Sequence, residues 1–132
     1  MEYQLGNLFN RFTNMFENYG VYIKTCTKAE IETYIFEEFD LDVIGLLHKN
    51  IVHLLEMEGL IDSEISQNCA KLRESFFALK GTELWNIQSV KNALEWINIL
   101  KLVDKIRGLI HQRWTQHELD EIYKINQYCR VE

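Results

Sequence analysis

The sequence predicts an all-α protein, folded as a compact antiparallel bundle of five to seven helices. Three observations favour this class. The 132 residues include no proline and only six scattered glycines, whereas an all-β fold of this length needs many turns rich in both. Apolar side chains recur at spacings of three and four along most of the chain, as in amphipathic helices. Polar residues with the spacing of helix caps precede several of these stretches.

The first two helices follow from this periodicity. Apolar spacing predicts a helix over residues 3–19, and Gly20 suits its C-terminal end. Thr27 and Glu30 have capping-box spacing, in which each side chain binds the backbone N–H of the other residue. A second helix is therefore expected to begin after Thr27. The residues that it is expected to bury are Ile31, Phe39 and either Tyr34 or Ile35.

A third helix is predicted to run unbroken from a cap at Asp40 or Asp42 to a stop at Gly59. It is strongly apolar, so we expect it near the centre of the bundle. A fourth helix is expected to open at Ser63 and to end at Gly81. The apolar positions assigned to the third helix are Val43, Ile44, Leu47, Ile51, Leu54 and Leu55.

The rest of the chain is predicted to hold one irregular stretch followed by two more helices. Residues 82–92 lack clear periodicity, but Trp85 and Ile87 are too large and apolar to stay in water, so this connection is expected to pack on the core. Capping-box spacings then predict two further helices. These pairs are Asn92 with Glu95, which precedes a long helix to Ile110, and Thr115 with Glu118.

One helical domain spanning residues 1–132 is expected, because this length is close to the commonest domain size. The N-terminus has neither the basic nor the apolar region of a secretory signal, and no apolar run approaches the length of a membrane span. Cys26, Cys69 and Cys129 are odd in number and widely spaced, which disfavours disulfides and favours a reducing cytoplasm.

Negative charge is concentrated in one segment. The net charge is −6, yet Glu30 to Glu64 alone holds ten acidic residues against one base, Lys49. Such a segment repels nucleic acid, whose binding depends on Lys and Arg at the phosphates, and attracts a basic partner. A simpler interpretation is that these acids complement helix dipoles and solvate a surface.

Aromatic residues interrupt the acidic segment and favour a binding role. Tyr34, Phe36 and Phe39 spread around the helix axis, so at least one is expected to remain exposed among carboxylates, where it would be an interface anchor. The candidate partner-binding residues are Glu30, Tyr34, Phe36, Glu37, Glu38, Asp40 and Asp42.

No catalytic, metal or cofactor site is expected. His48 and His53 are five apart, unlike the metal-binding H-E-x-x-H pair, and His117-Glu118 is not followed by the second histidine of that motif. The glycines at 59 and 81 are isolated and do not form a phosphate-binding loop. We therefore expect that the protein is not an enzyme.

One arginine-histidine pattern comes near a known catalytic motif. Helical RNases of the HEPN type carry an arginine and a histidine separated by four to six residues. Here Arg107 and His111 enclose three residues, as do Arg113 and His117. Both pairs are instead expected on solvated helix faces or at helix ends, where cations complement the dipole.

Four stretches carry a family resemblance: Leu60 to Ile65, Leu72 to Phe77, Leu84 to Asn92 and Trp96 to Leu100. In these stretches, and over roughly residues 43–110, the chain resembles small bacterial immunity proteins that accompany contact-dependent inhibition and other polymorphic toxins. The resemblance implies that the protein neutralises a toxin, and it transfers no catalytic residues.

The resemblance agrees with the charge pattern. A cytoplasmic immunity protein must bind its cognate toxin tightly, and a nuclease toxin with a basic cleft would match an acidic, aromatic-bearing face. We therefore expect occlusion of a basic toxin, with no direct nucleic-acid or membrane binding. The alternative is a helical interaction module, such as a bacterial or phage regulatory adaptor, in which a homodimer is possible.

Overall fold

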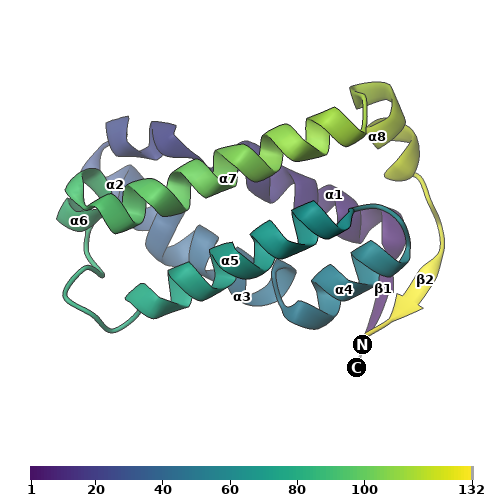
Figure 1. Ribbon diagram of the computed structural model, residues 1–132, viewed down its shortest axis with the longest axis horizontal. Coiled ribbons are helices and arrows are strands. Elements are labelled where there is room, and N and C mark those ends of the chain that lie inside the picture. The colour runs from purple at the N-terminus through teal and green to yellow at the C-terminus, as the bar shows by residue number, and fades with distance from the viewer. Residues whose placement is uncertain (132) are drawn as a thin grey trace.

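Helices fill most of the chain between one short strand at each end (Figure 1). The computed structural model describes residues 1–131. Because α2, η2 and α3 follow one another without a break, the described residues form seven helical rods and the 3-10 helix η1. The all-α bundle of five to seven helices is thus confirmed. The elements are β1 (Glu2–Gln4), α1 (Leu5–Asn18), η1 (Val21–Thr25), α2 (Lys28–Ile31), the π-helix η2 (Glu32–Phe39), α3 (Asp40–Leu46), α4 (Lys49–Met57), α5 (Ser63–Leu79), α6 (Ile87–Asn92), α7 (Leu94–Arg113), α8 (Gln116–Ile122) and β2 (Tyr128–Arg130).

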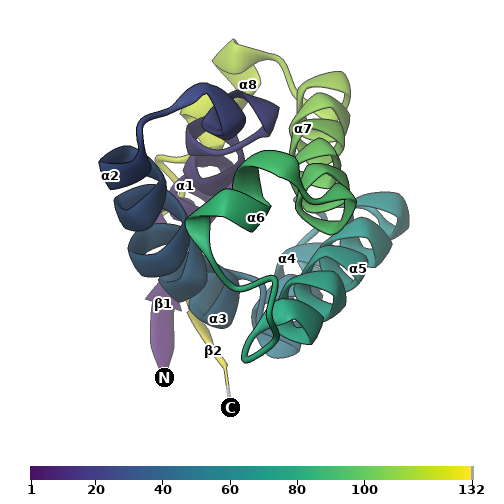
Figure 2. The same ribbon diagram turned by 90° about the vertical axis from the view of Figure 1, so that its left-hand side faces the viewer.

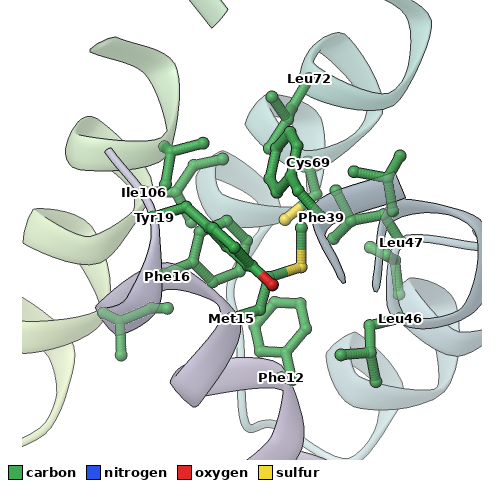
Figure 3. Packing of buried hydrophobic residues seen from close by; sticks show 14 of the residues in the cluster. Phe12, Met15, Phe16, Tyr19, Phe39, Leu46, Leu47, Cys69, Leu72 and Ile106 are labelled. Carbon is green, nitrogen blue, oxygen red and sulfur yellow. The ribbon is translucent and has the colours of Figure 1, made fainter. Parts of the chain in front are cut away.

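The bundle is built around α7, which packs against both α5 and α1. Figure 2 shows the α2 to α3 rod on one side of the molecule and α5 with α7 on the other. The buried apolar side chains form one cluster between these two sides. Trp85 and Ile87 pack against it, as predicted for the connection before α7. Figure 3 shows part of the cluster, with Phe12, Met15, Phe16, Tyr19, Phe39, Leu46, Leu47, Cys69, Leu72 and Ile106 labelled.

One expectation about the chain ends is corrected. The first helix begins at Leu5 and not at residue 3, because Glu2–Gln4 form a strand that pairs antiparallel with Tyr128–Arg130. The N-terminal ammonium also donates to the carbonyl oxygen of Val131 at 2.9 Å. Strands of three residues are too short to show a two-residue period in the sequence.

Gly6 allows α1 to approach the turn after α8. A Cβ at this position would lie 2.3 Å from the carbonyl oxygen of Tyr123, which is backbone and cannot rotate away. Gly6→Ala should therefore lower the free energy of unfolding by about 1–3 kcal/mol, the usual cost of overpacking. Gly108→Ala on α7 is the control, because a Cβ there would meet no other atom within 4 Å. This control should gain about 1 kcal/mol in helix propensity.

Urea unfolding followed by circular dichroism measures both changes. Equal shifts of the midpoint in the two variants would contradict the close approach at Gly6.

The third predicted helix is divided in two. It stops at Leu46, and α4 begins at Lys49 with His48 as its N-cap. The Nδ1 atom of His48 accepts the backbone N–H of Asn50 at 3.1 Å. Neither Asp40 nor Asp42 is a cap, because α3 continues directly from η2. Gly59, with a φ of 76°, follows the end of α4 as expected.

Two of the three predicted capping boxes are confirmed. Both capping boxes, Thr27 with Glu30 and Thr115 with Glu118, are present. The prediction for Asn92 with Glu95 is wrong, because Asn92 is the last residue of α6 and Ala93 precedes α7 without a side-chain cap. The fourth helix is capped by Asp62, whose Oδ1 accepts from Ile65 N–H at 2.9 Å; Ser63 is its first residue.

Arg107 connects α7 to the end of α1. Its guanidinium donates to the carbonyl oxygens of Phe16 and Tyr19 at 3.0 and 3.2 Å and pairs with Asp104 at 2.7 Å. These carbonyls belong to the last turn of α1, where helices have unpaired acceptors and a partial negative charge. Arg107 thus caps a neighbouring helix from within α7, a contact that the expected solvated face or helix end does not include.

Candidate partner-binding face

The α2 to α3 rod is oriented by a buried stripe with a period of four residues. Ile31, Ile35, Phe39 and Val43 are all completely buried. In an α-helix, steps of four drift around the axis because 3.6 residues make a turn. The wider π-helix reduces this drift; here the N–H of Asp40 reaches the carbonyl of Ile35, five residues earlier. One side of the rod therefore stays in the core and the other stays in solvent.

Three of the candidate acids have internal partners. Glu30 accepts the backbone N–H of Thr27 at 2.9 Å within the capping box, and hydrogen bonds from Thr27 lower the pKa of its carboxyl group. Asp40 pairs with Lys80 at 2.7 Å. Asp42 accepts the hydroxyl of Tyr19 at 2.9 Å. These carboxylates are fixed by the fold, so their positions relative to a partner are set in advance.

Glu37 and Glu38 differ from those acids. Both are exposed on η2, and within residues 1–131 neither has a hydrogen-bond or ion-pair partner. An exposed carboxylate without an internal partner is hydrated and can pair with a cation of another molecule. The rod thus presents two free negative charges beside three that are already held in place.

Asp42 is half-buried, and this burial raises the pKa of its carboxyl group. Loss of solvent raises the pKa of its carboxyl group, and the hydrogen bond from Tyr19 and the charge of Arg11 oppose the shift only in part. Burial also raises the pKa of the Tyr19 phenol, with Asp42 as the next cause. The Tyr19 hydroxyl therefore remains protonated and available as the donor.

Asp42→Asn should change how stability depends on pH. The folded protein binds the Asp42 proton more tightly than the unfolded chain, so this group favours folding in acid and that contribution is lost as the pH rises through the raised pKa. Asparagine accepts from Tyr19 without a charge. The variant should therefore gain stability relative to the natural protein as the pH rises from about 3 to 7. Urea unfolding at several pH values tests this; a constant difference would contradict it.

The expectation of an exposed aromatic residue is wrong. Phe39 is completely buried, and Tyr34 and Phe36 are only partly exposed. The ring of Phe36 packs edge-on against Trp85, with centroids 5.0 Å apart, and against Trp96 at 6.1 Å. These contacts draw Phe36 towards the core. The role of Tyr34 and Phe36 as interface anchors stays a prediction.

Two aliphatic residues provide the apolar surface instead. Leu41 is 69% exposed and Ile44 is 44% exposed, on the turns of α3 that follow Glu37 and Glu38. The periodicity of the third predicted helix places Ile44 in the core, and that prediction is wrong. The sequence holds a signal for the exposure of Leu41 and Ile44, because neither residue belongs to the buried series at positions 31, 35, 39 and 43. We call Glu37, Glu38, Leu41 and Ile44 the η2–α3 face.

Metal ligands and cysteines are the other groups to consider in the described chain. Over residues 1–131, no three His, Cys, Asp or Glu side chains are grouped so that they could hold a metal ion. Cys26, Cys69 and Cys129 are free thiols, and burial raises the pKa of each. A raised thiol pKa disfavours the nucleophilic thiolate.

Comparisons with protein-family models, curated proteins and solved structures find no match to this chain. None of the described helices combines the length and apolarity that crossing a membrane requires.

Proposed function

We propose that this chain is an immunity protein that binds a cognate toxin domain and neutralises it by occlusion, without catalysis. The observation that carries this proposal is the η2–α3 face, where the free carboxylates of Glu37 and Glu38 adjoin the exposed side chains of Leu41 and Ile44. Charge with exposed apolar anchors is the composition of a protein-binding surface. The resemblance to bacterial immunity proteins supplies the class of partner.

The expected partner is a basic toxin domain in the cytoplasm. A nuclease must attract phosphates with Lys and Arg, so its cleft is positively charged. The acids between Glu30 and Asp42 would draw such a cleft towards the α2 to α3 rod. Opposite charge accelerates association, and desolvated apolar contacts slow dissociation.

The acidic residues would contribute in two ways. Glu30 and Asp42 are held by internal contacts and would add a fixed field, whereas the charge of Asp40 is balanced by Lys80. Glu37 and Glu38 are free to pair with cations of the toxin. Leu41 and Ile44 would be the principal apolar anchors, and Tyr34 and Phe36 would flank them.

A co-expression experiment tests the proposal. An immunity gene is expected directly downstream of its toxin gene. The toxin domain encoded directly upstream of this chain's gene is therefore expressed with and without this chain. Cells should survive only with it, and Glu37→Lys/Glu38→Lys should abolish protection. Glu2→Lys/Glu74→Lys changes two acids outside the face by the same net charge and should protect.

The outcomes separate role from mechanism. Protection by the Glu37→Lys/Glu38→Lys variant would reject the acidic-face mechanism. Death of cells that carry the natural chain would reject the immunity role.

A second candidate function is a helical interaction protein, such as a regulatory adaptor or a self-associating module. A lysine-lined groove between α5 and α7 favours it, because none of its lining residues belongs to the η2–α3 face and it therefore offers a second binding surface.

A further inference from the structure

The helices α5 and α7 leave a groove of about 490 Å³ between them. Its lining has an apolar floor and exposed polar residues at its edges. The apolar lining residues are Ala78 and Leu79 of α5 and Ile99 and Leu102 of α7. A groove between two packed helices with such a floor suits an amphipathic helix, which lays its apolar side chains into it.

The edges of the groove are positively charged. Lys71, Lys101 and Lys105 line it and are exposed. Within residues 1–131 none of them has an ion-pair partner. Glu95 is the single acid among the lining residues that the structure describes. The complementary ligand is therefore a helix with aliphatic side chains flanked by carboxylates.

The chain itself carries a helix of this kind. Glu37, Leu41 and Ile44 follow one another at steps of four and three residues, so they lie along one side of the α2 to α3 rod, beside Glu38. All four side chains are exposed. On the buried side of the rod, Phe39 packs against Phe76 of α5 with ring centroids 5.1 Å apart. The exposed side therefore faces away from α5 and is not placed to fill the groove of its own molecule.

We propose that the α5–α7 groove of one molecule receives the η2–α3 face of a second copy. Leu41 and Ile44 contact the apolar floor, and Glu37 and Glu38 pair with the lysines at the edges. The two surfaces are different and lie on opposite sides, so the contact is head-to-tail and each added molecule leaves one groove and one face open. Assembly therefore depends on concentration and extends beyond a dimer.

This self-association competes with the proposed toxin for the same face. A single helix in a groove buries less than a standard interface of about 800 Å² per partner, so the contact is weak. A basic partner that binds the η2–α3 face more tightly would dissociate the assembly. The inference does not depend on the immunity role, because it follows from the complementarity of two surfaces of this chain.

Charge-reversal variants test the contact in analytical ultracentrifugation of the full chain over a wide range of concentration. The natural chain should form oligomers that grow with concentration. Lys101→Glu/Lys105→Glu, which alters the groove, and Glu37→Lys/Glu38→Lys, which alters the face, should each weaken association by roughly tenfold or more. Unchanged circular dichroism spectra verify that both variants are folded.

Mixing the two variants gives the decisive result. The groove variant retains an intact face and the face variant retains an intact groove, and the two altered surfaces carry exchanged charges that are again complementary. An equimolar mixture should therefore regain association that grows with concentration, although neither variant associates well alone. A natural chain that remains monomeric throughout would overturn the proposal, and so would a mixture that associates no better than either variant alone. Because no toxin is present, either result leaves the proposed immunity function to its own test.

Discussion

Replacing Trp96 by alanine should lower the free energy of unfolding by about 3–5 kcal/mol, the usual cost of removing a large buried aromatic side chain. Trp96 is completely buried on α7. Its ring centroid lies 5.9 Å from that of Phe76 on α5, 5.7 Å from Trp85 in the connection and 6.1 Å from Phe36 on η2. The substitution thus removes the ring through which α7 contacts α5, η2 and the connection that contains Trp85.

Trp96→Phe is the matched control. It keeps most of the ring volume but loses the hydrogen bond from the indole Nε1 to the carbonyl oxygen of Leu84, which is 2.7 Å long. Loss of this bond should cost about 1–2 kcal/mol. Urea unfolding measures both variants; if alanine were no more destabilising than phenylalanine, the aromatic cluster would not hold the two sides of the bundle together.

Leu41→Ala/Ile44→Ala should weaken binding of the cognate toxin domain by roughly tenfold to a hundredfold, because desolvated apolar anchors carry much of an interface's binding energy. Most of the change should appear as faster dissociation. Since both side chains are exposed in the free protein, the free energy of unfolding should hardly change.

The control for this pair is Met57→Ala/Leu94→Ala, which removes two exposed apolar side chains on α4 and α7. Toxin binding by the control should match that of the natural chain. Surface plasmon resonance gives both rate constants, and equal dissociation rates for the two double variants would show that Leu41 and Ile44 are not anchors.

Most of the helices follow from local sequence patterns. The α1 stripe, both capping boxes and the glycines after α4 and α5 depend on residues within a few positions of one another, so the sequence alone reveals them. The concentration of acids between Glu30 and Glu64 is equally visible, although only the fold shows that Asp40 is paired with Lys80, forty residues away.

The features that the sequence does not predict depend on tertiary structure or on unusual local geometry. Histidine is not among the usual N-cap residues, so no local pattern indicates the break at His48. The buried stripe of the α2 to α3 rod has a period of four, which excludes Ile44; this period is readable in the sequence, but it is expected only if part of the rod is a π-helix. Phe36 is drawn inward by Trp85 and Trp96, which are distant in the sequence.

The most direct test of the acidic-face mechanism is the association rate constant with the toxin domain, measured by stopped flow at increasing salt. At low salt, Glu37→Lys/Glu38→Lys should slow association by roughly tenfold and reduce its dependence on salt. Glu2→Lys/Glu74→Lys, with the same net charge, should keep a rate and salt dependence closer to those of the natural chain. If the two variants instead associate at the same rate at every salt concentration, the η2–α3 face does not guide the encounter and the account is wrong.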